Sequence, residues 1–325
     1  MSALASLSSE PRLLIEATLR PIQGHRFQPT GFADLGPARF TGPDGSEMLL
    51  VESAQSVANR LELSVYDPAK GDLIPELEGL PYVKVLGLQD QLLTSTLLEA
   101  HRINSPYVLE ASDNQVKTTL EKELGNLNEG PIDFRRVAKC LFKLDPNSLL
   151  HGCFLAILDG RLRITRAVTG FIEATGVRPA ESGGVKNDRV NQTGDAALGK
   201  GNVPYSRTEF TASHLSGYFN IDLALLRGYG LPAEAVDLLI SLALLKIQRF
   251  LEEGLRLRTA CDLEIVQIKA TRPSSYTLPD IQTLLKESKG LIGKCTGANL
   301  FAKPAITEVT YKGDIAKKKK KEKAE

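Results

Sequence analysis

The chain has 325 residues, of which 42% are hydrophobic and 24% charged, the composition of a folded protein with a sizeable core. The apolar run LLISLALL is too short to span a bilayer, and the N-terminal stretch MSALASLSSEPR lacks the basic and apolar regions of a secretory signal. We therefore expect no membrane association and a cytoplasmic localisation.

Positive charge is concentrated at the C-terminal end. The formal net charge is +1, but residues 317–325 contain six lysines and two glutamates, which leaves 34 basic and 37 acidic side chains in residues 1–316. A lysine run lacks apolar groups and repels itself, so residues 316–325 are expected to be a disordered tail. Any nucleic-acid function must then depend on where individual Arg and Lys residues lie.

The first elements are predicted from hydrophobic periodicity. In RLLIEATL, residues 12–19, Ile15, Ala17 and Leu19 alternate with Glu and Thr, which predicts a half-buried strand. A helix is predicted within LLVESAQSVANRLE, residues 49–62, because apolar residues recur there at helical spacing. The apolar positions of that helix are Leu50, Ala54, Val57, Ala58 and Leu61.

The middle of the chain is less regular. Prolines punctuate residues 64–150, where helices are predicted over residues 92–103 and 132–144. In CFLAILDGRLRITRAV, residues 153–168, two apolar-alternating runs are joined by an Asp-Gly pair at 159–160, which predicts a tight hairpin.

The last part begins with residues 176–206, which are rich in Gly, Asn, Asp and Pro and are expected to be irregular. A helix follows, with Pro232 at its start and Gly254 at its end, and it is apolar on nearly all sides. Because such a helix must be buried, we expect it to be central. ACDLEIVQIKA, residues 260–270, predicts a final strand.

The predicted order is strand, helix, hairpin, helix, strand, which is typical of a split βαβ fold. The sequence therefore predicts an α+β protein with a ferredoxin-like or RNA-recognition-type sheet, interrupted by two long insertions. We expect one domain over residues 1–315, with insertions at about 64–150 and 171–220.

Metal binding and disulfides are not indicated. Cys140, Cys153, Cys261 and Cys295 are widely spaced and form no C-x-x-C pair, so buried free thiols are expected and no zinc site. His151 lies near Cys153, but two ligand types without a second pair do not make a tetrahedral site.

Nucleotide hydrolysis is disfavoured. GDAALGKG, Gly194 to Gly201, nearly matches a phosphate-binding loop, but Gly201 replaces the hydroxyl residue that would bind magnesium. The loop also lacks an apolar strand before it and a helix after it, so an ATPase dependent on Lys200 is a weak alternative. No G-x-S-x-G turn is present to support nucleophilic hydrolysis.

Four loops share a composition that suits single-stranded RNA. GHRFQPTG, EAHRINSPY, GGVKNDRVNQTG and GNVPYSRTEF each combine one or two cations with amides or hydroxyls, and most add an aromatic ring. Cations bind phosphates and rings stack on bases, while glycines allow close approach of the backbone. Ordinary surface turns have a similar composition, so this pattern alone leaves both interpretations open.

Several motifs together resemble the CRISPR-associated backbone subunit of type I-G (formerly I-U) Cascade effectors, a member of the repeat-associated mysterious protein (RAMP) superfamily. They occur in order between about residues 13 and 266. The motifs are IEATLRPIQGHRFQPTGFADLGPARF, LVESAQSVANRLE, LLEAHRINSPY, DPNSLLHG, GGVKNDRVN, GNVPYSRTEFTA, LRGYGL and RFLEEGLRLRTACDLE.

This resemblance implies a palm with thumb-like and finger-like insertions. Such subunits polymerise along the spacer of a CRISPR guide RNA and present it for pairing with target DNA, together with further copies of themselves and other Cascade subunits. It implies no cofactor, no metal and no catalytic centre, so we expect no enzymatic activity. We expect the sheet to lack the aromatic pair of RNA-recognition domains, and residues 183–202 to form the thumb.

The predicted RNA contacts come from the loops and from the polar side of the first helix. An alternative is a metal-independent endoribonuclease that processes precursor guide RNA, with His25 or His214 as general acid or base. The predicted RNA-binding residues are Arg20, Gln23, His25, Arg26, Gln28, Ser53, Ser56, Asn59, Arg60, His101, Arg102, Lys186, Asn187, Arg189, Asn202 and Arg207.

Overall fold

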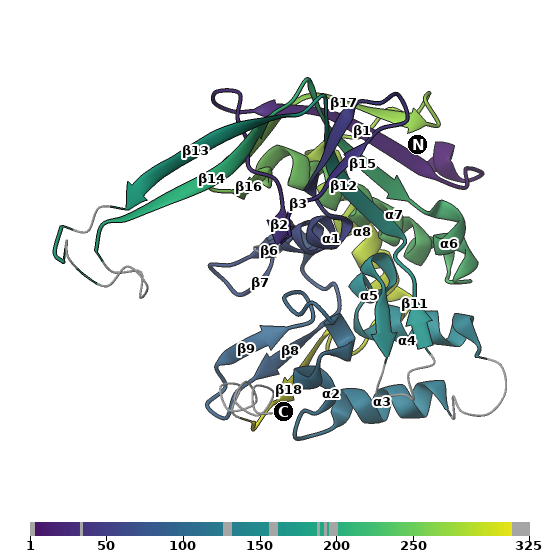
Figure 1. The fold of residues 1–325 in the computed structure, drawn as a ribbon. Helices are drawn as coiled ribbons and strands as arrows, with labels where there is room; N and C mark the ends of the chain where they lie inside the picture. Colours follow the sequence, from purple (N-terminus) through teal and green to yellow (C-terminus); the bar gives the residue numbers. More distant parts are fainter. Residues whose placement is uncertain are drawn as a thin grey trace.

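The computed structural model describes residues 4–32, 35–125, 132–155, 162–186, 189–191, 194 and 201–313. A large sheet backed by helices forms the upper part of Figure 1, smaller elements form the lower part, and a two-stranded arm extends to one side. The predicted α+β class is confirmed. None of the helices in these residues is long and apolar enough to cross a membrane.

The large sheet has seven strands, and every neighbouring pair runs antiparallel. β1 (Leu13–Pro21) lies between β17 (Cys261–Arg272) and β15 (His214–Ile221), which confirms the strands predicted over residues 12–19 and 260–270. The complete order is β16 (Arg256–Arg258), β17, β1, β15, β12 (Val168–Thr175), β5 (Glu47–Glu52) and β4 (Arg39–Thr41).

One face of this sheet is buried against helices. Every second residue of β1 from Leu13 to Leu19 is buried, because successive side chains of a strand point to opposite faces. The Phe219 ring of β15 lies 6.2 Å from the Phe250 ring of α7 (Ala233–Glu253), measured between centroids. The main core therefore lies between the sheet and α7.

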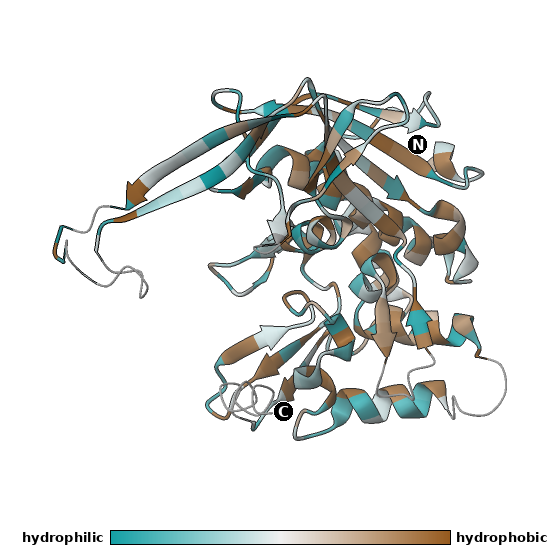
Figure 2. Ribbon diagram, viewed as in Figure 1, coloured by the Kyte–Doolittle hydropathy of each residue, from teal (hydrophilic) through white to brown (hydrophobic). Residues whose placement is uncertain are grey.

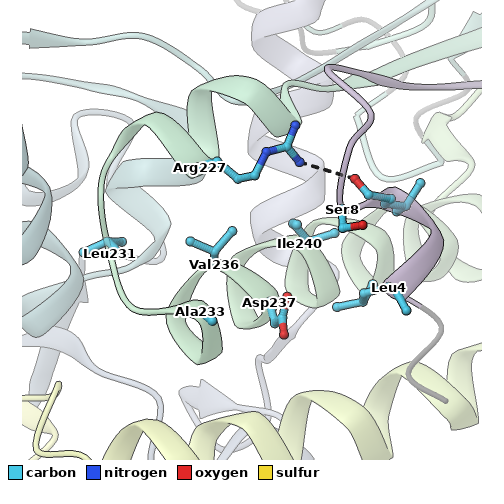
Figure 3. A pocket seen from close by; sticks show the side chains of 10 residues that line it. Leu4, Ser8, Arg227, Leu231, Ala233, Val236, Asp237 and Ile240 are labelled. Atoms are coloured by element: carbon cyan, nitrogen blue, oxygen red, sulfur yellow. Dashed lines mark hydrogen bonds between the residues drawn. The ribbon is translucent and has the colours of Figure 1, made fainter.

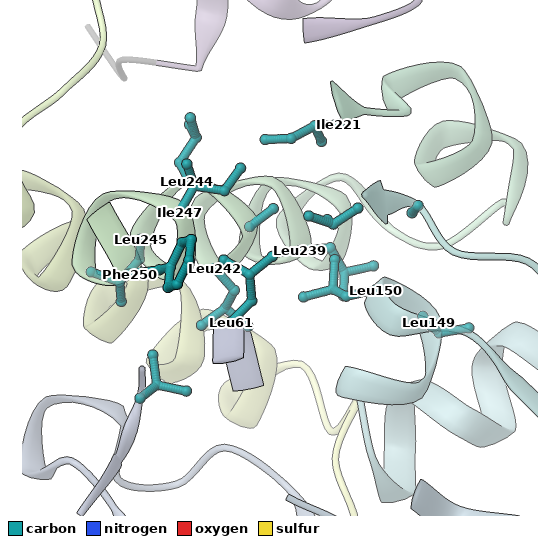
Figure 4. Close-up of a cluster of buried hydrophobic side chains, with 14 of the residues drawn as sticks. Leu61, Leu149, Leu150, Ile221, Leu239, Leu242, Leu244, Leu245, Ile247 and Phe250 are labelled. Carbon is teal, nitrogen blue, oxygen red and sulfur yellow. The ribbon is translucent and has the colours of Figure 1, made fainter. Parts of the chain in front are cut away.

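Helix α7 is central, as predicted from its all-round apolar composition. Pro232 is its N-cap and Gly254 its C-cap, so both predicted ends are confirmed. Its leucines pack among Leu61, Leu150 and Ile221, which come from three other elements (Figure 4). Figure 2 shows the same concentration of apolar residues along α7.

The helix predicted within residues 49–62 begins later than expected. α1 spans Ala54–Leu63, and the preceding residues form β5. The N-cap is Ser53, whose Oγ accepts a hydrogen bond of 3.3 Å from the backbone N–H of Ser56. Leu50 fits the helical spacing but lies in the strand, because a short apolar run before a helix is compatible with either period.

The lower part contains a three-stranded sheet in the order β18-β8-β9 (Figure 1). β18 (Ile306–Thr310) runs parallel to β8 (Tyr82–Leu86), and β9 (Leu92–Ser95) runs antiparallel to β8. The helix predicted over residues 92–103 is therefore wrong, because that segment contains β9, a turn and the beginning of the 3-10 helix η3 (Arg102–Asn104).

Helices complete the lower part. α4 (Phe134–Leu144) confirms the helix predicted over residues 132–144. Apart from the two hairpins described next, the other elements in the described residues are η1 (Ala5–Leu7), β2 (Gly31–Phe32), β3 (Gly36–Pro37), β6 (Tyr66–Asp67), β7 (Asp72–Leu73), η2 (Pro75–Leu77), α2 (Pro106–Leu109), α3 (Gln115–Leu124), α5 (Asn147–His151), α6 (Leu223–Gly228) and α8 (Ile281–Gly297).

The hairpin predicted over residues 153–168 exists but is not part of the large sheet. β10 (Cys153–Leu155) pairs antiparallel with β11 (Leu162–Ile164) in a separate two-stranded sheet. The Asp-Gly pair at 159–160 lies outside the described residues. The position of the central hairpin was therefore predicted wrongly: between α1 and α7, the large sheet is extended by β12 and β15.

The segment expected to be irregular, residues 176–206, contributes most of the arm. β13 (Arg178–Lys186) pairs antiparallel with β14 (Val203–Thr211) along its whole length. Glycines hid this strand, because they weaken the β-propensity of its outer half. Gly183 is required by close approach, since a Cβ there would lie 2.6 Å from the carbonyl oxygen of Tyr205.

Candidate nucleic-acid interface

The loop after β1 is fixed to the base of the arm by backbone hydrogen bonds. Phe27 and Phe210 of β14 exchange two N–H···O bonds of 2.9 Å, and the Phe27 side chain is buried. The backbone N–H of Gln28 donates to the carbonyl of Ala260 at 2.7 Å. The loop is therefore an anchored part of the surface. Its exposed polar side chains are Gln23, His25 and Arg26.

Glu209 of β14 brings two predicted RNA-binding arginines together. Its carboxylate lies 3.3 Å from Arg26 Nη1 and 3.7 Å from Arg207 Nη1, and the residue is only 7% exposed. Two guanidinium groups share one carboxylate, so one positive charge is left over. Arg207 also lies over the Tyr205 ring, 5.6 Å from its centroid. Cations beside an exposed ring suit single-stranded nucleic acid.

The outer end of the arm carries the next group of predicted contacts. Lys186 and Asn202 lie near the ends of β13 and β14 and are exposed, as is Arg189. Val185 is also exposed, and Figure 2 shows an apolar residue at this end of β13. Asn187 lies outside the described residues, as do residues 195–200 of the loop that resembles a phosphate-binding loop.

The predicted contacts on α1 are largely committed to the protein itself. Glu52 at the end of β5 is buried and accepts hydrogen bonds from Ser56 Oγ, Arg60 Nε and Arg258 Nη2. Arg60 also donates to the carbonyl of Leu257 at 2.6 Å. These contacts hold the start of α1 against β16.

The same network reaches the loop after β1, residues 22–30, which we call the opening loop. Arg258 Nη1 donates to the carbonyl of Gln28 at 2.7 Å, so Glu52 positions the loop through Arg258.

Two further predicted contacts also have partners within the protein. The amide oxygen of Asn59 accepts from Gln55 at 3.1 Å. Arg20, at the end of β1, forms an exposed ion pair of 2.7 Å with Glu264.

Arg102 is not a surface cation, so its prediction as an RNA contact is wrong. It is 4% exposed, and its Nε and Nη2 donate to the two carboxylate oxygens of Glu62 at 2.6 and 2.7 Å. Nη1 donates to the carbonyl of Gly152 at 3.1 Å. All three nitrogens of this guanidinium are engaged inside the protein, whereas the neighbouring His101 is exposed.

Arg102 lies beside a group of buried ionisable side chains that the sequence analysis missed. Lys246 of α7 is buried, and its Nζ contacts Asn147 Oδ1 and lies 3.0 Å from His151 Nε2. Burial lowers the pKa of Lys246 to about 8 and raises that of Asp145 to about 6. A lysine in the middle of an all-round apolar helix was the available signal.

The loop histidines and the cysteines considered for acid–base or metal chemistry come from different parts of the chain. His25 and His214 are both exposed loop or strand-end residues. In the part of the chain that the structure describes, no three His, Cys, Asp or Glu side chains are placed to hold a metal. All four cysteines are buried free thiols, as predicted, and burial raises the pKa of Cys140 to about 11.

A pocket of about 480 Å³ lies elsewhere, between the N-terminal segment and α7 (Figure 3). Arg227 closes one end by donating to the carbonyl oxygens of Leu7 and Glu10. None of the predicted RNA-binding residues lines it. Its described lining residues are Leu4, Ala5, Leu7, Ser8, Arg227, Leu231, Ala233, Val236, Asp237 and Ile240.

The large sheet does carry an aromatic pair, contrary to prediction. Phe171 of β12 and Tyr218 of β15 are cross-strand partners, with ring centroids 5.3 Å apart and planes inclined by 35°. The pair was missed because the two residues are far apart in sequence and β12 was not recognised as a strand of this sheet.

No curated protein sequence matches the chain. A structure described as a CRISPR RNA-guided surveillance complex, pre-nicking, is similar at 14% identity and a TM-score of 0.43, covering 80% of this chain and 75% of that one. A second CRISPR RNA-guided surveillance complex gives 13% and 0.36, covering 80% and 68%. Csc2 of Thermofilum pendens gives 10% and 0.33, covering 92% and 86%.

A family model gives the clearer assignment. The model of CRISPR-associated protein GSU0053 (Cas_GSU0053) matches residues 13–179, which is 167 of the 325 residues. The matched part includes β1, the opening loop, α1 and most of the lower part. The predicted relationship to CRISPR-associated proteins is confirmed, and the chain belongs to the family of CRISPR-associated protein GSU0053.

Proposed function

We propose that the chain is a guide-RNA-binding backbone subunit of a CRISPR effector complex. It binds the spacer part of the guide RNA, polymerises along it with further copies of itself, and presents it for pairing with target DNA. Family membership supports the CRISPR context. The observation that carries RNA binding is the junction of opening loop and arm, where Arg26 and Arg207 share Glu209 beside Tyr205.

The sheet topology supports the palm of this proposal. The strand order β17-β1-β15-β12, all antiparallel, together with α1 and α7, agrees with the order expected for a ferredoxin-like or RNA-recognition-type sheet. In this assignment the arm is the thumb, and the elements between α1 and β12 are the finger-like insertion. In the chain, β13 of the arm follows β12 of the palm, and β14 of the arm precedes β15 of the palm.

The chemistry of the junction suits backbone recognition more than base recognition. Guanidinium groups on an anchored loop bind phosphates without regard to sequence, and base pairing supplies specificity. We therefore assign no catalytic role and no cofactor to this subunit. Other Cascade subunits would complete the complex, and cleavage would be left to a recruited helicase-nuclease.

Assembly on RNA of increasing length tests the proposal. Native mass spectrometry of the protein with unstructured RNAs should show a subunit number that rises in steps with RNA length. The Arg26→Ala, Arg207→Ala variant should form fewer complexes at the same concentration. A subunit number that stays fixed for all lengths would contradict a backbone role.

A precursor RNA that contains the repeat tests the endoribonuclease alternative. Metal-independent cleavage that is lost in His25→Ala or His214→Ala would replace the proposed function with guide processing. We expect intact RNA with the wild-type protein and with both variants.

A further inference from the structure

The face of the large sheet opposite the core is open. Buried and more exposed residues alternate along β12, along β15 and along β1 up to Arg20, so every second side chain there points away from the helices. In Figure 1 all the labelled helices lie on one side of this sheet. Phe171 and Tyr218 belong to the partly exposed set, so their rings lie on the open face.

Two carboxylates flank this aromatic pair. Glu16 of β1 is the direct cross-strand neighbour of Tyr218, on the side opposite Phe171. Glu173 follows Phe171 by two residues on β12 and therefore shares its face. Across the strands, Glu16, Tyr218 and Phe171 are therefore direct neighbours in that order. Glu173 lies two residues further along β12 on the same face.

Within the described part of the chain, neither Glu16 nor Glu173 belongs to an ion pair. Burial raises the pKa of Glu173, and no cation contributes to offset it. Lys269 is the cross-strand partner of Glu16 but forms no ion pair with it, and Arg20 on the same face is paired with Glu264. Partly desolvated carboxylates without partners favour the approach of a cation.

We propose that Phe171, Tyr218, Glu16 and Glu173 form a docking site for a basic segment of a partner protein. An arginine side chain fits best, because its planar guanidinium can stack on the rings while its edge donates to the carboxylates. A phosphate at this position would face two negative charges, which disfavours RNA. The site lies on the sheet face and is distinct from the junction of opening loop and arm proposed to bind RNA.

Peptide binding to the full-length protein tests this site. The probe is a fluorescein-labelled arginine–glycine repeat peptide, compared with the same peptide in which neutral citrulline replaces arginine. Fluorescence anisotropy should show binding of the arginine peptide only. The isosteric change Glu16→Gln, Glu173→Gln should weaken this binding roughly fivefold or more, because it removes both charges that the guanidinium meets.

A matched variant controls for overall charge. Glu76→Gln, Glu78→Gln changes the net charge equally, and both residues are exposed in the lower part of the molecule. It should bind the arginine peptide as tightly as the wild type, and a loss equal to that of the sheet variant would overturn the proposal. Equal binding of the citrulline peptide would overturn it as well.

Ring variants separate this site from a base-stacking surface. Phe171→Leu with Tyr218→Leu should weaken peptide binding and leave affinity for unstructured RNA unchanged. If RNA affinity falls while peptide affinity stays, the face binds bases and the proposal is wrong. If the ring variant does not fold, peptide and RNA affinities are measured with the Glu16→Gln, Glu173→Gln variant, which keeps the side-chain shape. Weaker peptide binding supports the proposal, and unchanged peptide binding contradicts it.

Discussion

Arg102 and Glu62 form a bidentate ion pair in the interior, 40 residues apart in the sequence, with N···O distances of 2.6 and 2.7 Å. The pair connects α1 to the 3-10 helix η3, and through the carbonyl of Gly152 to the start of β10. Burial raises the pKa of Glu62, although the Arg102 charge opposes that shift. Each partner therefore depends on the other.

Breaking this pair should destabilise the protein without touching the RNA interface. Arg102→Ala leaves an uncompensated buried carboxylate, so we expect a loss of about 3–5 kcal/mol in the free energy of unfolding. Urea titration followed by circular dichroism measures this loss, and the exposed Arg136→Ala serves as control with a change within about 0.5 kcal/mol. An unchanged unfolding midpoint combined with weaker RNA binding would restore Arg102 as an RNA contact.

Lys246 should make stability depend on pH in the alkaline range. Its folded pKa of about 8 lies below the usual value of 10.5, so between these values the unfolded chain binds more protons than the native protein. This group therefore makes stability rise as the pH increases from 8 to 10.5. Wild-type stability minus that of Lys246→Met should rise by at most about 1.4 kcal/mol per pH unit. A difference that stays flat would show that Lys246 titrates normally.

Arg26 and Phe27 are neighbours with separable roles. Arg26→Ala should weaken RNA binding and reduce the magnitude of the log–log salt slope by about 0.7, because one phosphate contact is lost. Phe27→Ala should instead cost about 3–5 kcal/mol of stability, because a buried ring that anchors the loop is removed. Arg135→Ala, at an exposed position of α4, should change neither quantity. If Arg26→Ala leaves RNA affinity unchanged, the opening loop is not part of the interface.

The outer end of the arm should add uniform affinity for all RNA sequences. Replacing Lys186 and Arg189 with alanine should flatten the salt slope by about 1.4, since two phosphate contacts are lost. Lys286→Ala, Lys289→Ala on α8 is the matched control, because these exposed lysines are also three residues apart. An unchanged slope together with altered circular dichroism would make the arm end structural.

Hydrophobic periodicity predicted the elements whose burial pattern is regular along their length. β1 and α7 were found because β1 is half buried and α7 is buried on nearly every side, so their patterns depend on no other segment. Residues 92–103 and the two strands of the arm were missed for the opposite reason. Their conformation depends on partner strands that are separated from them in sequence and compensate for weak local propensity.

The sequence predicted the loops of the candidate site but not the ion pairs between its side chains. The composition of residues 22–30 indicated exposed polar groups, and Gln23, His25 and Arg26 are exposed there. Nothing in the sequence indicated that Glu209 would bring Arg26 and Arg207 together, or that Glu62 would bury Arg102. A charged residue is identified as surface or interior only when its counter-ion is known, and that requires the tertiary fold.

The parallel pairing of β8 with β18 has a consequence for synthesis of the chain. Tyr82 lies opposite Ile306, so the small lower sheet joins residues from the first third of the chain to residues near its end. Closing so long a stretch of polypeptide delays contacts of this kind. During translation, β8 and β9 are synthesised well before β18, so one edge of β8 stays unpaired until β18 is made. An unpaired strand edge favours transient association with other chains. The lower part can be completed only after residues 306–310 have been synthesised.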